Sequence, residues 1–289
     1  MDPDAAPAFS FSQALSTLLS STLITMAFTA CHTYRTDDTT FELQPKAKTP
    51  DSVAASKKPP GKKKKKKTIY LTFDDGPNKG TRKLAGIVEA EQVPVTLFIV
   101  GEHVYGSREQ SAMYDTVAHN PLFEIANHSF THAFNNKFSR FYAVPDSAVK
   151  DFIRCADSLH LTANIIRTPG RNIWRTGSVK STDVSSSNCA ADSLYNKNFT
   201  VMGWDLEWHF DNNLHVTCTE DDLLQQVDSM FAQNRTKTAG HLVLLAHDQV
   251  YAHSDDSAAL HQFIKKLKAK EEYDFEVISK YPDVMRNHE

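Results

Sequence analysis

From residue 68 onward, short apolar runs alternate with longer segments in which apolar residues recur every three or four positions. The short runs predict strands at 68–73, 95–100, 123–126, 164–167, 200–204, 241–246 and 275–278. The longer segments predict helices at 81–91, 108–118, 146–159, 221–232 and 257–270. Strands that alternate with helices form parallel sheets, so the pattern predicts an α/β domain. About seven strands in one domain favour a barrel, complete or incomplete.

The first 31 residues follow a different pattern. Residues 14–30 are mostly apolar or small, but seven of these seventeen are Ser or Thr, so we do not expect a membrane-spanning helix. Their length fits the apolar region of an export signal, although Asp2 and Asp4 stand where such a signal carries positive charge. Residues 28–31 resemble a bacterial lipoprotein cleavage box, with Cys31 as the lipidated residue. We expect export, to the periplasm or to a lipid anchor on a bacterial envelope membrane. The alternative is a disordered tail.

Residues 32–67 show little apolar periodicity and end in six consecutive lysines, from Lys62 to Lys67. This composition predicts a disordered linker that leads into one domain at 68–289. The lysines are interpreted as a solvated tether. An alternative interpretation is attraction to an anionic surface such as lipid headgroups.

Composition limits the partners. The chain has 289 residues, 40% of them apolar, which is enough for one large core. The net charge is −3, but residues 68–289 carry 21 basic and 29 acidic side chains, and this acidic balance argues against a nucleic-acid partner. Beyond Cys31, Cys155, Cys189 and Cys218 form no CxxC pair. One disulfide with one free thiol, or three buried thiols, are both compatible with this spacing.

Two adjacent carboxylates, Asp74 and Asp75, follow the first expected strand, and Gly76-Pro77 turns the chain directly after them. The carboxyl ends of strands are where α/β folds place their chemistry. Adjacent carboxylates repel and lose solvation when partly buried. A metal ion would remove that conflict, with one Asp as its ligand and the other free as a base. Taken alone, the same residues are typical of a solvated turn.

His128 and His132 follow the strand expected at 123–126. Four residues apart, they are expected on one face of a helical turn, where both can bind one ion. A strand-end Asp with two His forms a facial triad with open positions. Zn²⁺ suits these ligands, and Co²⁺, Ni²⁺ or Mn²⁺ could compete. The pair alone is weak evidence, because the chain has 13 His.

Three further strand ends carry chemical groups. Arg167 can orient a neighbouring carboxylate through two hydrogen bonds, or can form an ordinary surface ion pair. Trp204 and Trp208 could stack on a sugar, or belong to the core. His247 follows an apolar strand, and an imidazole with a pKa near neutrality suits general acid catalysis.

Over residues 68–289, these stretches in this order resemble the polysaccharide deacetylases with a NodB-homology domain (carbohydrate esterase family 4). The residues that carry the resemblance are Thr-Phe-Asp-Asp-Gly-Pro at 72–77, His-Ser-Phe-Thr-His at 128–132, and the stretches that end at Arg167, Trp208 and His247. The resemblance implies a distorted (β/α)₇ barrel, a TIM-like α/β fold.

The resemblance also implies roles for individual residues. These are the general base Asp74, the metal ligands Asp75, His128 and His132, the base-positioning Arg167, the general acid His247, the histidine-orienting Asp205, Leu245 beside the acetyl methyl group, and Trp174, Trp204 and Trp208 along the substrate. Two departures from the family pattern stand out. Residues 170–172 separate Pro169 from the aromatic Trp174, and one residue rather than two separates Asp205 from Glu207. Which of these two acids supports His247 is open.

The resemblance therefore implies a metal-dependent hydrolase that removes acetyl groups from an N-acetylhexosamine polysaccharide. Peptidoglycan, another envelope glycan or a chitin-like polymer is the expected substrate, and a monomer is assumed. An esterase acting on O-acetyl groups of xylan or another glycan is one alternative. A non-catalytic envelope protein that only binds glycan is another.

Overall fold

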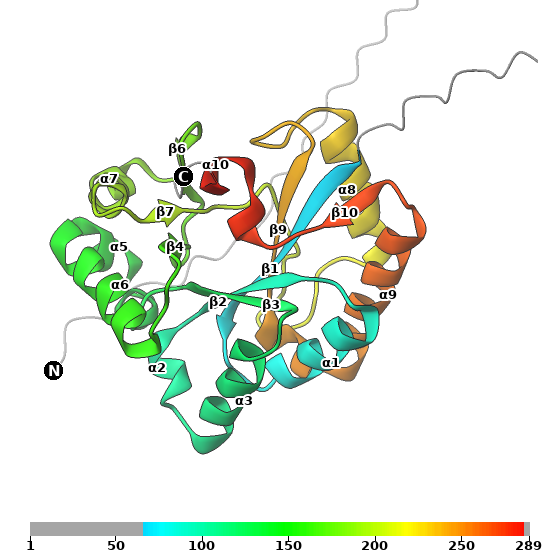
Figure 1. Ribbon diagram of the computed structural model, residues 1–289, viewed down its shortest axis with the longest axis horizontal. Coiled ribbons are helices and arrows are strands. Elements are labelled where there is room, and N and C mark those ends of the chain that lie inside the picture. The colour runs from blue at the N-terminus through cyan, green and yellow to red at the C-terminus, as the bar shows by residue number, and fades with distance from the viewer. Residues whose placement is uncertain (1–65, 286–289) are drawn as a thin grey trace, which may run out of the picture. The chain divides into compact units, whose positions relative to one another are not determined.

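The computed structural model describes residues 66–285 (Figure 1). The chain divides into two units, 1–60 and 61–289, and every described residue belongs to the second. The predicted export signal, Cys31 and nearly all of the predicted linker lie outside the described residues. No helix within 66–285 is long and apolar enough to cross a membrane.

One curled sheet of ten strands forms the centre of the described unit (Figure 1). The strands are β1 (Lys67–Gly76), β2 (Val95–Ile99), β3 (Phe123–Asn127), β4 (Ile165–Ile166), β5 (Ile173–Arg175), β6 (Lys180–Thr182), β7 (Thr200–Val201), β8 (Leu206–Glu207), β9 (His241–His247) and β10 (Tyr273–Phe275). Their order is β6-β5-β7-β4-β3-β2-β1-β9-β8, and β10 pairs with the start of β1. Among these ten strands, the two pairings of β5 are antiparallel and the others are parallel. Within 66–285, β6 and β8 do not pair with each other, so the barrel is open and distorted, as predicted.

The five predicted helices are all present as α1 (Thr81–Glu91), α3 (Arg108–Ala118), α6 (Pro145–Leu159), α8 (Glu220–Ala232) and α9 (Ser254–Ala269). The first two have the predicted bounds. The structure adds α2 (Gly101–Val104), α4 (His132–Asn136), α5 (Phe138–Ala143), α7 (Asn188–Asn196) and α10 (Pro282–Met285). It also adds the 3₁₀ turns η1 (Ser185–Ser187), η2 (Asp248–Ala252) and η3 (Ile278–Lys280). These additions, together with the short strands β5, β6 and β8, are too short to show a period in the sequence.

Side chains that alternate between the two faces of the sheet pack into two separate apolar cores. In β1, Ile69 packs with residues of α1, α8 and α9, whereas Tyr70 belongs to a second cluster, with Val243 of β9. Since strand side chains alternate between faces, every second residue after Tyr70 and Val243 continues along the same inner face. That alternation carries Asp74 and His247, which are register partners, to the inner side at the carboxyl ends of their strands.

The cysteines of the described unit are free thiols. Cys155 is buried on α6, Cys218 is half-buried and Cys189 is exposed. The structure therefore has three thiols, as in one of the two predicted arrangements, but only one of them is buried, so the prediction of three buried thiols was wrong in that respect.

Candidate active site

The carboxyl ends of the strands surround a cavity of about 300 Å³. Its lining residues are Asp74, Asp75, His128, His132, Phe138, Gly170, Trp204, Glu207, Leu245 and His247. Residues that the sequence places at four separate strand ends therefore come together at one site.

A β-bulge brings the two adjacent aspartates to the same side of the sheet. Consecutive strand residues normally point to opposite faces. Here the register with β2 shifts between Asp74 and Gly76, and Asp75 adopts a left-handed φ of 74°. The ring Nδ1 of His103 hydrogen-bonds the Asp75 carbonyl at 2.8 Å and supports this turn. As a result, Asp74 Oδ2 and Asp75 Oδ1 lie 3.6 and 3.5 Å from the same atom, His128 Nε2.

The two histidines do not share a right-handed helical turn, so that prediction was wrong. His128 lies just beyond β3, and Ser129 has a φ of 66° that turns the chain. His132 then begins α4, whose five residues all have positive φ. His132 Nε2 nevertheless lies 3.1 Å from Asp75 Oδ1, because the loop folds back over the end of β1.

The site fits a divalent cation. His128 Nδ1 donates to the Arg167 carbonyl at 2.9 Å, and His132 Nδ1 donates to Asn136 Oδ1 at 2.6 Å, which leaves a lone pair on each Nε2. Buried Oδ1 of Asp75 accepts no hydrogen bond from the described residues. The three ligand atoms lie within 4.8 Å of one another. Tetrahedral ligands at about 2.0–2.1 Å from zinc are about 3.3 Å apart, close to the 3.1 and 3.5 Å from Asp75 Oδ1 to the two Nε2 atoms.

Asp75 is held in the charged form that a metal ligand needs. Burial raises the pKa of its carboxyl, but the imidazoles of His128 and His132 outweigh burial and hold the pKa well below its usual range. Positive charge shared by this cluster, carried by a proton or a cation, stabilises the carboxylate.

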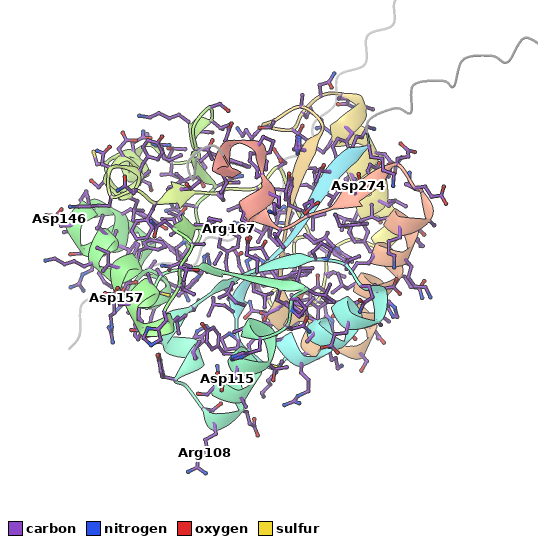
Figure 2. The ribbon with its side chains drawn as sticks, viewed as in Figure 1. Arg108, Asp115, Asp146, Asp157, Arg167 and Asp274 are labelled. Atoms are coloured by element: carbon purple, nitrogen blue, oxygen red, sulfur yellow. The ribbon has the colours of Figure 1, made fainter. Side chains whose placement is uncertain are left out.

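Arg167 connects the Asp74 carboxylate to the sheet. It is fully buried near the middle of the ribbon (Figure 2). Nη1 donates to Asp74 Oδ1 at 2.8 Å and to Thr72 Oγ1 at 2.7 Å. Nε and Nη2 donate to the carbonyls of Met202 and Gly203. Arg167 therefore contacts a neighbouring carboxylate, as predicted, but through one hydrogen bond to Asp74 rather than the two that were predicted.

His247 does not contact Asp205, so the structure contradicts the predicted pair. Asp205 Oδ2 accepts from the backbone N–H of Val243 and Oδ1 from that of Lys237, both within β9 or the loop before it. Burial raises the pKa of Asp205 to about 6, against the lowering effect of these N–H groups. No described group bonds the buried Nδ1 of His247. Glu207, the alternative acid in the sequence, lines the cavity with His247.

Two of the three predicted substrate tryptophans are core residues. Trp174 is 0% and Trp208 1% exposed. Trp174 packs on Tyr281 and donates its N–H to Asn172, while Trp208 packs on Phe263 of α9. Since neither ring is accessible, neither can stack on a sugar, and these two predictions were wrong. Trp204 lines the cavity.

Sequence reasoning missed four residues of the site: Thr72, Phe138, Gly170 and Asn136. Thr72 could have been found from alternation, because it lies two residues before Asp74 on the inner face. Phe138 begins the short helix α5 and Gly170 lies in the turn after β4, and no period in the sequence places either residue at the cavity. Asn136 lies four residues after His132, and only the turn at 132–136 brings the two side chains into contact.

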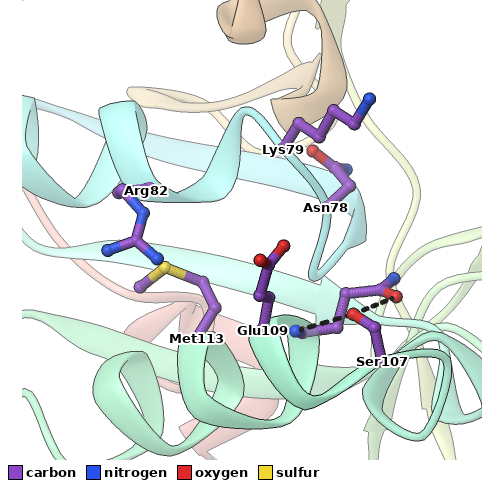
Figure 3. Close-up of a pocket in the computed structure, with 7 residues that line it drawn as sticks. Asn78, Lys79, Arg82, Ser107, Glu109 and Met113 are labelled. Atoms are coloured by element: carbon purple, nitrogen blue, oxygen red, sulfur yellow. Dashed lines mark hydrogen bonds between the residues drawn. The ribbon is translucent and has the colours of Figure 1, made fainter.

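A larger cavity, of about 370 Å³, lies between the β1–α1 loop and α3 (Figure 3). Asn78, Lys79, Arg82, Ser107, Glu109, Gln110 and Met113 line it. None of these residues is among the predicted bases, acids or metal ligands. The smaller cavity is therefore the candidate active site.

The family model for polysaccharide deacetylases matches residues 61–159, which include both Asp74-Asp75 and the two histidines. Over this third of the chain, the sequence is similar to the polysaccharide deacetylase family. The later strand ends, with Arg167 and His247, fall outside the match.

Individual relatives agree with this family. YheN of Bacillus subtilis is 28% identical over 208 residues, which cover 70% of this chain and 64% of YheN. A peptidoglycan-N-acetylglucosamine deacetylase of Bacillus cereus is 27% identical, over 72% of this chain and 67% of that protein. A carbohydrate esterase of Streptococcus mutans has the same fold, with a TM-score of 0.53, 21% identity, and coverage of 73% of this chain and 86% of the esterase. The chain thus spans less than two thirds of the length of YheN.

Proposed function

We propose that this protein is a metal-dependent hydrolase that removes acetyl groups from an N-acetylhexosamine polysaccharide, with peptidoglycan or a related envelope or chitin-like glycan as substrate. The observation that carries the proposal is that the two neighbouring aspartates contact different groups. Asp75 faces two imidazoles, and Asp74 faces Arg167. The Bacillus cereus relative, by its name a peptidoglycan-N-acetylglucosamine deacetylase, supports the substrate class.

Asp75, His128 and His132 would hold the ion. Zn²⁺ is our choice, because imidazole nitrogens with one carboxylate suit it, and Co²⁺, Ni²⁺ or Mn²⁺ are the alternatives. When bound, the ion would acidify a water molecule and polarise the acetyl carbonyl.

The chain's own residues supply the proton transfers. Asp74 lies beside the three proposed metal ligands but is not one of them. Its carboxylate, which Arg167 orients, takes the proton of the attacking water. His247, on the adjoining strand β9, lines the same cavity and protonates the leaving amine. An amine is a poor leaving group, so this protonation matters, and such assistance is typically worth ~10²–10⁴ in rate. Leu245 and Trp204 line the same cavity, and the acetyl group and the sugar would contact their apolar surfaces there.

The test is acetate release from an N-acetylglucosamine oligomer, with the mass loss of one acetyl group per event. We expect release by the wild type with added Zn²⁺ and little by Asp74→Asn or His128→Ala. His119→Ala, on an exposed histidine bonded to α3, is the matched control and should match the wild type. Release by either site variant at the wild-type rate would contradict the assigned roles.

Substrate screening separates the remaining alternatives. Release from acetylated xylan but not from the oligomer would support the O-acetyl esterase. Binding of the oligomer with Zn²⁺ present but no release would support a glycan-binding protein.

Export and anchoring at Cys31 form part of the same proposal. They would place the enzyme beside an envelope polymer, and the lysines that precede β1 would serve as the tether. Labelling of the expressed chain with a radioactive fatty acid, compared with Cys31→Ser, tests the anchor directly.

A further inference from the structure

Asn136 is the feature of the site that neither the sequence nor the assigned chemistry accounts for. Its Oδ1 lies 2.6 Å from His132 Nδ1. An amide oxygen can only accept, so this contact holds a ring hydrogen on Nδ1. Nε2, which lies 3.1 Å from Asp75 Oδ1, is then the ring atom that can give its lone pair to a cation.

The two candidate histidine ligands are oriented in different ways. The acceptor for His128 is the backbone carbonyl of Arg167, within the buried sheet. The acceptor for His132 is an exposed side chain on a short turn. Substitution of Asn136 can therefore remove the orienting contact of one ligand while the other keeps its own.

The conformation that brings Asn136 to His132 is a left-handed turn. Residues 132–136 have φ between 45° and 66°, and none of them is glycine. Left-handed helix costs roughly 1–2 kcal/mol per residue, with Asn among the residues that tolerate it best. In such a turn, as in its mirror image, residues four apart lie on one face, so Asn136 lies beside the His132 ring.

The surrounding structure holds this turn in place. The N–H of Asn135 donates to the Thr131 carbonyl at 2.8 Å, and Lys137 donates to that of Ala133 at 2.9 Å. Ala133 is buried, and Phe134 packs edge-on against Phe141. Strained backbone that is fixed by packing is common where a protein positions functional groups.

We propose that Asn136 is a positioning residue that fixes the tautomer and orientation of His132 for a divalent cation bound with Asp75 and His128. This inference rests on the metal site of the proposed function. Loss of a contact that orients a metal-binding histidine typically weakens metal affinity 10–100-fold.

The test measures binding of Zn²⁺ alone, by competition with a chelating indicator, and needs no substrate. We expect Asn136→Ala and Asn136→Gly to weaken Zn²⁺ binding by about 10–100-fold. Gly favours the left-handed conformation, so Asn136→Gly removes the acceptor without adding backbone strain. Asn136→Asp keeps an acceptor oxygen and should retain an affinity close to that of the wild type.

Asn135→Gly is the matched control, because Asn135 shares the left-handed turn and, among the described contacts, its side chain forms no hydrogen bond to His132. Its affinity should equal that of the wild type. Nitrogen-15 NMR of the imidazole in the metal-free protein gives an independent measurement. The wild type and Asn136→Asp should show His132 protonated on Nδ1, and Asn136→Gly should lose this preference.

Equal Zn²⁺ affinity of the wild type and Asn136→Gly would overturn the inference and leave the proposed function intact. A loss of affinity in Asn135→Gly as large as in Asn136→Gly would also overturn it, because the turn rather than the acceptor would then be responsible. Failure of the wild type to bind any divalent cation would overturn the proposed metal site, and this inference with it.

Discussion

The site has two halves that are built differently. One half comes from β1, β3 and β9, strands of five to ten residues with partners along their length. The other half comes from the segment between β4 and β8, whose strands are two or three residues long. In the first half, predicted residues face the cavity. In the second half, Asp205, Trp174 and Trp208 were predicted to belong to the site but do not line the cavity. A strand needs several paired residues before its alternation fixes where a side chain points.

The strongest test of the first half is His247→Ala. We expect acetate release from an amide substrate to fall by about 10²–10⁴, because the leaving amine loses its proton donor. With an O-acetyl ester the fall should be smaller, since an alkoxide leaves more readily than an amide anion. Parallel kcat measurements on both substrates check this. Equal falls on both substrates would argue against the role of His247 as the acid.

Two buried arginines of the second half can be compared directly, because Arg167 bonds Asp74 of the first half and Arg175 bonds only its own half among the described contacts. Arg167→Met leaves the Asp74 carboxylate buried without its partner, which we expect to cost about 3–5 kcal/mol of unfolding free energy and, through misplacement of the base, about 100-fold in acetate release. Denaturant unfolding and release per folded molecule measure the two effects.

Arg175→Met is the control in the second half. Arg175 is also buried, and bonds Asp192, Asn188 and backbone carbonyls. We expect a stability loss of about 1–3 kcal/mol and release near the wild-type rate. A large fall in release would show that contacts made within the short-strand half also support the chemistry.

Substitution of Trp208 and Trp204 compares a tryptophan of the core with one that lines the cavity. Trp208→Ala should cost about 3–5 kcal/mol of stability, because it empties a packed site in the core, and should leave the KM of the folded enzyme unchanged. Trp204→Ala should raise KM with a smaller effect on stability, since Trp204 lines the cavity. If KM rose in Trp208→Ala instead, the original assignment of that ring to the substrate would be restored.

The smallest expected effect is the contribution of Asp205 to the unfolding free energy, which should depend on pH. Its pKa is raised to about 6 in the folded state, against about 3.9 when unfolded. The folded state therefore binds the proton more tightly, and the contribution of Asp205 to stability falls as pH rises from about 4 to 6. Asp205→Asn lacks this titration. Its unfolding free energy relative to the wild type should rise by up to about 3 kcal/mol across that interval, at about 1.4 kcal/mol per pKa unit.

The matching pH profile of acetate release tests the same residue. Because Asp205 bonds only the backbone around β9, Asp205→Asn should leave that profile unchanged. A shifted profile would indicate that Asp205 acts through His247.

The sequence alone determined the long strands and helices, since period and alternation are local properties. Predicted helices 81–91 and 108–118 agree with α1 and α3 residue for residue. It also determined which strand ends carry Asp74, Asp75, His128, Arg167 and His247, because the residue types and their order along the chain are sufficient for that.

Only the tertiary structure decided how these residues converge. The bulge at Asp75, the left-handed turn that joins His132 to Asn136, and the burial of Trp174 and Trp208 all depend on neighbours distant in sequence. A left-handed backbone is unfavourable by itself, so packing and hydrogen bonds from elsewhere must hold it, and no local pattern records that support. The exposure of an indole ring is likewise set by what packs against it.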